Sequence, residues 1–381
     1  MSTIRINEGT SVKQVIDWNS DKDDLITFEI LHKSSFQVFA EGIALGVLRT
    51  LVHRGKRIKI ELYKSLNIDK GVKIEDIHPI FTSIFGLELL RVSSQTVFQA
   101  TEVENFRSVI GELVWGRIIE QGGIIGDGKT TYLFSRHDYE IPKCLRHGER
   151  SDLFPRFDYF HSKFSSFLSK MHGQKKGNSP EERDLIEWLH HIAENAFEHG
   201  RYSAIRREFT EGFRGILLGK SHFSRRNEVY VRKDYPAFVR NYMKSLVKNG
   251  RCPPSNFAIN YATVMDLGDG IQHTLRSDSE KTDFELLQYA FVDGVTRKQN
   301  FSKEKAGFGL GQAMNSAVSL GAILHIASAE VETYIDFSTE NFEEPQKGAL
   351  PFSSERKLGK SIGTSVSILW ISASKASKEG F

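Results

Sequence analysis

The most informative segment of the sequence is SPEERDLIEWLHHIAENAFEHG, residues 179–200. Ser179 fits the N-cap of a helix, Pro180 fits its first position and Glu182 completes a capping box. The segment therefore predicts a helix with two faces. Its apolar face comprises Leu185, Leu189, Ile192 and Ala196, and its polar stripe comprises Glu187, His191, Glu194, Asn195 and Glu198.

Three further segments follow, and each joins a glycine-rich turn to a regular element. VMDLGDGI (264–271) predicts a strand that runs into Asp266, followed by a glycine turn. AGFGLGQAMNSAVSLGA (306–322) predicts a glycine turn that opens a helix of small residues. GKSIGTSVSILWI (359–371) predicts a Gly-Thr turn that enters a final strand.

Together, the four segments resemble the four sequence boxes of the GHKL superfamily, which includes DNA gyrase, Hsp90, MutL and the ATP-binding domains of histidine kinases. The resemblance covers about residues 175–372. Each box is weak alone, but here all four occur in the right order. The resemblance implies an α/β sandwich of the Bergerat type (the histidine kinase-like ATPase fold) over residues 173–381, with ATP and Mg²⁺ as ligands.

The resemblance also implies a role for each matching residue. Asn195 matches the helix asparagine whose side-chain oxygen binds Mg²⁺, a hard ion that takes few protein oxygens. Asp266 matches the aspartate that accepts a hydrogen bond from the adenine amino group, and Thr364 matches a threonine that supports the adenine site. The remaining matches are Gly268 and Gly270 beside the base, Gly307, Gly309 and Gly311 at the phosphates, and Arg297, Lys298, Lys303 and Lys305 in a lid over ATP.

One position departs from the members of the family that hydrolyse ATP. They carry a glutamate, the general base, four residues before the asparagine, where this chain has His191. Glu194 directly precedes Asn195 and projects about 100° away from it around the helix. Because a histidine can also take a proton near neutral pH, His191 and Glu194 are the candidate catalytic residues, with simple pocket lining an equal alternative for His191. We expect ATP binding rather than fast hydrolysis.

The resemblance leaves two functions open. In the first, the chain is a regulatory protein kinase or nucleotide-gated switch that acts on a protein partner, in the manner of anti-sigma kinases. In the second, it is an ATP-driven switch that forms a homodimer, like gyrase, Hsp90 or MutL, and engages nucleic acid. The nucleic acid would meet a basic insertion at about 201–255, where residues 201–251 carry 13 Lys/Arg against 4 Asp/Glu. A solvated basic surface is the simpler interpretation of that stretch.

Residues 1–172 predict a separate, smaller α/β domain with a regulatory or interaction role. LITFEI (25–30) and KRIKIEL (56–62) predict strands on either side of a helix at 41–55, which makes a βαβ unit, and residues 81–121 predict mainly helix. This domain weakly resembles the STAS-type fold of anti-sigma antagonists. The segment GQKKGNSP (173–180) predicts the linker to the second domain.

GIIGDGKT (123–130) matches the spacing of a phosphate-binding P-loop. A true P-loop follows a buried strand and opens a helix, whose first amides hold the phosphates. Here a helical pattern precedes the turn and TTYLFS (130–135), a strand pattern, follows it. We therefore expect the nucleotide downstream, and Lys129 to be an exposed residue of a turn.

Composition narrows the class of protein. Hydrophobic residues at 39% and charged residues at 26% of 381 residues are typical of a globular protein with room for two cores. No apolar run has the length of a membrane span, and the first residues, MSTIRINEGTSV, lack a secretion signal. Two cysteines, Cys144 and Cys252, cannot form a disulfide framework. We expect a cytoplasmic protein without membrane contact.

Overall fold

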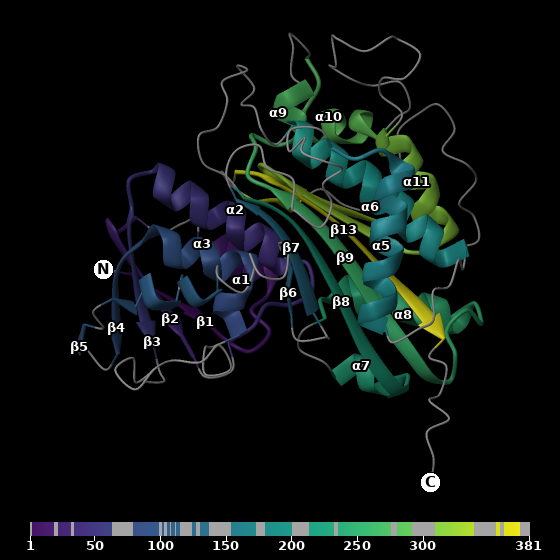
Figure 1. Cartoon of the computed structure of the whole chain (residues 1–381), viewed down its shortest axis with the longest axis horizontal. Coiled ribbons are helices and arrows are strands. Elements are labelled where there is room, and N and C mark those ends of the chain that lie inside the picture. The colour runs from purple at the N-terminus through teal and green to yellow at the C-terminus, as the bar shows by residue number, and fades with distance from the viewer. Residues whose placement is uncertain are drawn as a thin grey trace.

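The computed structural model contains two sheets, each covered by helices (Figure 1). It describes residues 2–18, 22–31, 34–62, 79–98, 101–102, 105–106, 108–110, 112–114, 124–126, 130–136, 154–172, 180–199, 213–231, 235–275, 280–291, 309–338, 356–358 and 362–373.

The first sheet comes from the N-terminal part of the chain, and its first four strands run parallel in the order β1-β2-β3-β4. Its βαβ unit confirms the prediction, because two parallel strands flank a helix whose apolar residues are buried. The sheet contains β1 (Ser2–Ile6), β2 (Leu25–Ile30), β3 (Arg57–Leu62), β4 (Ser93–Phe98) and β5 (Thr101–Glu102), with α1 (Val12–Asp17), α2 (Ala40–His53), the 3-10 helix η4 (Pro79–Thr82) and α3 (Ile84–Val92).

The second sheet has eight strands in the order β12-β11-β10-β13-β9-β8-β7-β6, and every pairing is antiparallel. The strands are β6 (Ile124–Gly126), β7 (Thr130–Arg136), β8 (Phe213–Arg225), β9 (Ser255–Asp266), β10 (Ile323–Ser328), β11 (Val331–Asp336), β12 (Arg356–Lys357) and β13 (Thr364–Ala373).

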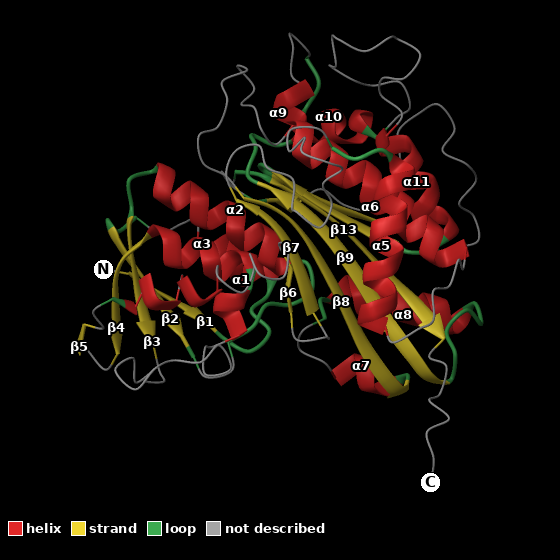
Figure 2. Ribbon diagram, viewed as in Figure 1, coloured by secondary structure: helices red, strands yellow, loops and turns green. Residues whose placement is uncertain are grey.

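Helices cover both faces of the eight-stranded sheet (Figure 2). One face packs its apolar side chains against α5, α6, α10 and α11, and the other packs against α8 and, near one end, α2. Alternation along each strand produces this arrangement, since successive side chains point to opposite faces. The helices are α5 (Phe157–His172), α6 (Pro180–His199), α7 (Asn227–Val231), α8 (Ala237–Lys248), α9 (Ile271–Leu275), α10 (Asp283–Ala290) and α11 (Gly309–Ser319).

The second sheet reaches further toward the N-terminus than the expected boundary at residue 173. β7 pairs along its whole length with β8, and α5 packs on α6 through Phe160 and Phe164. The two sheets therefore divide the chain between β5 and β6, and the predicted linker at 173–180 lies between two helices of the same layer. Strand pairing is long-range, so local composition does not reveal it.

Two predictions for the region between residues 81 and 136 can be compared with the structure. The helix expected over 81–121 is interrupted by β4, because the β-branched and aromatic residues of SSQTVF pair with β3. The segment that matches a P-loop lies in a hairpin, in which β6 and β7 pair antiparallel. Residues 127–129 between the two strands, Lys129 included, lie outside the described part of the chain. The next described element after β6 is the strand β7, whereas a P-loop opens a helix, which agrees with the expectation that this match is not a P-loop.

The structure confirms an α/β class with one mainly parallel and one antiparallel sheet. Within the described residues, no helix combines the length and apolar character that crossing a bilayer needs.

Candidate functional site

A row of four polar side chains crosses the second sheet at one end. Arg214 of β8 pairs with Asp266 of β9, Asp266 pairs with Thr364 of β13, and Thr364 pairs with Ser328 of β10. All four are buried. They share the face that packs on α6, because the next two rows on that face are apolar: Ile216, Val264, Val366 and Ile326, then Leu218, Ala262, Ile368 and Leu324. On this face of the sheet, the apolar core therefore stops at a row of four buried polar side chains.

Asp266 is the acidic member of this row. Gly268 donates its backbone N–H to Oδ1 at 2.7 Å, and among the described residues the other carboxylate oxygen has no hydrogen-bond donor. Burial raises the pKa of Asp266 to about 6, while the Gly268 hydrogen bond and the positive charge of Arg214 act in the opposite direction. A buried carboxylate with one open oxygen can accept a hydrogen bond from a ligand.

Arg214 connects the row to α6. Its Nη1 donates to the carbonyl oxygen of Phe197 at 3.2 Å, and its guanidinium lies 5.5 Å from the centre of the Phe197 ring. Phe197 lies in the last turn of α6, two residues after Asn195. The end of β9 and the polar stripe of α6 are therefore parts of one packed region.

A hydrogen bond fixes the orientation of the Asn195 side-chain amide. Its Nδ2 donates to the His191 carbonyl oxygen at 2.8 Å. Because a carbonyl can only accept, the amide nitrogen must face it, and Oδ1 faces away. Gly309, the first residue of α11, lies beside Asn195 and His191 of α6. A Cβ on Gly309 would be 3.3 Å from Asn195 Nδ2 and 3.6 Å from His191 Nδ1. Two segments more than a hundred residues apart in the chain thus meet here.

Two glycines pack the turns around Asp266 and Thr364. Gly363 has φ 98°, and a Cβ there would lie 2.3 Å from the Asp266 carbonyl oxygen. Gly270 also has φ 98°, and its Cβ would meet the Ala329 side chain at 2.8 Å. Both need glycine for backbone conformation and for close approach. These contacts are with protein atoms, and the role of Gly270 beside a base stays a prediction.

Ser328 ties the turn after β9 to the row. Its Oγ accepts the Ile271 N–H at 2.8 Å and lies 3.3 Å from Thr364 Oγ1. Its carbonyl oxygen accepts from Gln272 Nε2 at 2.6 Å. The start of α9 is thereby held against the ends of β10 and β13, which positions Asp266 and Thr364 beside it.

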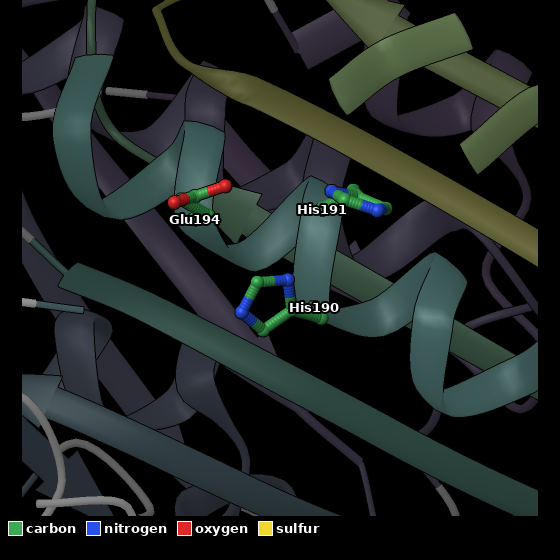
Figure 3. Close-up of side chains that lie close together, drawn as sticks. All are labelled: His190, His191 and Glu194. Carbon is green, nitrogen blue, oxygen red and sulfur yellow. The ribbon is translucent and has the colours of Figure 1, made fainter. Parts of the chain in front are cut away.

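The two candidate catalytic residues lie together with a third side chain. His190, His191 and Glu194 each place one ligand-type atom within 4.8 Å of those of the others, and Figure 3 shows the three side chains grouped on α6. His190 is buried among Phe154, Phe157 and Phe160. Burial lowers the pKa of the His190 imidazole, and its hydrogen bond to the Pro155 carbonyl oxygen partly opposes that effect.

Other predicted site residues are less informative. Gly311 is buried in the first turn of α11. Lys298, Lys305 and Gly307, with Arg297 and Lys303, lie outside the described residues. The basic segment is described only from residue 213 onward, where β8 is a central strand and α8 buries Tyr242 and Leu246 on the sheet. This part of the predicted insertion belongs to the core of the fold.

Four residues of the site were not predicted from the sequence: His190, Arg214, Ser328 and Gly363. The doublet of adjacent histidines and the Gly-Thr pair at 363–364 were visible signals for two of them. Arg214 and Ser328 come together with Asp266 only through strand register, which the sequence does not display.

No family model, no curated protein and no solved structure matches this chain. The functional conclusion therefore depends on the site itself.

Proposed function

We propose that the chain binds Mg²⁺-ATP between the polar row of the second sheet and the facing ends of α6 and α11, and that it acts as a regulatory protein kinase or nucleotide-gated switch on a protein partner. The observation that carries the proposal is the convergence of four separate segments, represented by Asn195, Asp266, Gly309 and Thr364. They lie far apart in the chain, yet each contacts or pairs with another of the four.

The adenine end of the ligand belongs at the row. Adenine carries an amino group that needs an acceptor, and the buried residue Asp266 has one carboxylate oxygen without a donor among the described residues. Thr364, its register neighbour, offers a hydroxyl that both donates and accepts. A guanine would place a carbonyl oxygen against the carboxylate, and that arrangement is repulsive.

The phosphate end belongs at α6 and α11. Asn195 directs Oδ1 away from its own helix, which suits a ligand to Mg²⁺. α11 begins at Gly309, and the first amides of a helix attract anions because they have no intrahelical partners. Catalysis of phosphoryl transfer would rely on positioning and charge neutralisation, so it needs no strong base at His191.

Calorimetric titration with ATP, in the presence and absence of Mg²⁺, tests the site. In Asp266→Asn, the Gly268 N–H holds the side-chain oxygen and the new NH₂ group faces the adenine amino group, so two donors meet. We expect affinity to fall roughly tenfold to a hundredfold, the equivalent of one hydrogen bond to a charged group. Asn195→Ala should mainly remove the dependence on Mg²⁺.

The matched control is Asp269→Asn, which removes the same charge three residues further on. It should bind ATP as the wild type does. Equal affinity in the wild type, Asp266→Asn and Asn195→Ala would disprove the site. The regulatory role is tested separately, by γ-labelled ATP with candidate protein partners: neither a labelled partner nor an ATP-sensitive complex would leave the kinase or switch without support.

A further inference from the structure

The group formed by His190, His191 and Glu194 has a chemistry that the proposed nucleotide site does not use. We propose that these three side chains bind a divalent transition-metal ion of the Zn²⁺ class, at a site distinct from the Mg²⁺ that would accompany ATP. This inference does not depend on the nucleotide.

The helix brings the three side chains to one side. At about 100° per residue, Glu194 projects between His190 and His191, since it follows them by four and three residues. Their ligand atoms lie within 4.8 Å of one another. Figure 3 shows the three side chains on one stretch of the α6 ribbon.

The surroundings of His190 fix the tautomer of its imidazole ring. Nε2 lies 2.9 Å from the Pro155 carbonyl oxygen, which can only accept, so Nε2 must carry a proton. With the proton on Nε2, Nδ1 of the neutral ring presents a lone pair. That nitrogen is buried, in a side chain only 5% exposed, and has no hydrogen-bond partner among the described residues.

An imidazole held in this way is the usual arrangement of a histidine that binds a metal. Such a ring commonly donates its other N–H to a backbone carbonyl, which sets the tautomer and the orientation of the ring. A tilted contact with Phe154 and edge-to-face contacts with Phe157 and Phe160 fix the His190 ring further. The His190 ring lies beside His191 and Glu194 in Figure 3, and the ligand-type atoms of the three residues lie within 4.8 Å of one another.

The ligand types select the ion. Two imidazoles and one carboxylate suit Zn²⁺ and its neighbours in the first transition series, whereas Mg²⁺ prefers oxygen ligands alone. Zinc ligands lie about 2.0–2.2 Å from the ion, so the atoms must approach one another more closely than 4.8 Å. His191 and Glu194 are only half-buried, and on metal binding they would move toward the fixed His190. Three protein ligands leave a fourth position for water or a ligand oxygen.

The test uses the full chain, freed of metal with a chelator and titrated with Zn²⁺ alone by calorimetry, without nucleotide. We expect one ion per chain. Titration with Co²⁺ should give the intense visible absorption of a four-coordinate ion. His190→Phe keeps an aromatic ring in the pocket but removes both nitrogens, and Glu194→Gln keeps the shape of the side chain but removes its charge. Each should weaken Zn²⁺ binding by about tenfold or more.

Two controls separate this site from others. His53→Phe removes an exposed histidine at the end of α2 and should leave Zn²⁺ binding unchanged. Asn195→Ala should also leave it unchanged, although that variant is expected to alter the Mg²⁺ dependence of ATP binding. If His190→Phe does not fold, Glu194→Gln decides the question. Absence of Zn²⁺ binding to the wild type, or wild-type affinity in Glu194→Gln, would overturn the proposal.

Discussion

Asp266 is a buried carboxylate whose charge opposes folding. Its pKa is raised from 3.8 to about 6, mainly by burial, with the Gly268 N–H and Arg214 only partly compensating. Between these two pH values the folded protein binds a proton that the unfolded chain releases, so stability falls as the pH rises through this window. Above about pH 6 the destabilisation is complete. A residue that lowers stability at neutral pH is typical of a functional position.

Asp266→Asn should therefore make the protein more stable while it weakens ATP binding. The asparagine oxygen can still accept the Gly268 N–H, and the buried charge is gone. At pH 7.5 we expect the free energy of unfolding to rise by roughly 1–3 kcal/mol, since one pKa unit corresponds to about 1.4 kcal/mol. At pH 3.5 most of the gain should be gone, because the wild-type carboxyl is then protonated in the folded state and mainly protonated in the unfolded state. Urea denaturation at the two pH values measures both quantities. A gain of equal size at both would contradict the assignment to charge.

At the scale of elements, the contact between α2 and β13 joins the two parts of the chain. A Cβ on Gly42 would lie 2.2 Å from Ser365 Oγ and 2.6 Å from its Cβ, so the helix rests on the strand only because residue 42 is glycine. Ser365 follows Thr364 directly and points to the opposite face of the sheet, toward α2 rather than α6. The site and the N-terminal part thus share one strand.

Gly42→Ala should separate α2 from β13 and lower the free energy of unfolding by about 1–3 kcal/mol, the usual effect of overpacking. In a Ser365→Gly background the clashing atoms are absent and the nearest remaining atom, Cα of residue 365, is 3.9 Å away. There the same substitution should be neutral or slightly stabilising, because alanine favours a helix more than glycine does. A double-mutant cycle by urea denaturation measures the coupling. An equal loss in both backgrounds would show that the contact is not the cause.

The elements that the sequence predicted are those with a local signal. The periodicity of apolar residues predicted α6, α2, β2 and β3. The glycine turns predicted where β9 ends and where β13 and α11 begin. The sequence did not predict that β6 and β7 belong to the second sheet, because this depends on the pairing of β7 with β8 across more than seventy residues. It also did not predict that α5 packs on α6. The site divides in the same way: Asp266 and Thr364 follow from motifs, whereas Arg214 joins them only through register.

At the scale of the whole molecule, aromatic stacking links the entrance of α2 to the far sheet. Phe39 has φ 76°, a left-handed conformation that is rare outside glycine, and its ring stacks on His325 with centroids 4.9 Å apart. Phe238 of α8 stacks on the same histidine at 5.6 Å and on Tyr334 at 4.8 Å. The strained backbone at Phe39 is sustained by this packing. One stack therefore joins a loop of the first part to two strands and a helix of the second.

The two sheets should consequently unfold together. One continuous apolar cluster contains the core of the first sheet and also Leu217, Met265 and Ala327 of the second. A shared core couples its halves, whereas domains that meet through a small interface unfold separately. Trp18 lies in this cluster and Trp188 in the core beneath α6, so each reports on one part. In variants that keep only one of these two tryptophans, the other tryptophans being replaced by phenylalanine, urea denaturation followed by fluorescence should give coincident midpoints. A transition at Trp18 completed while Trp188 remains native would show that the N-terminal part is an independent domain, as the sequence alone suggested.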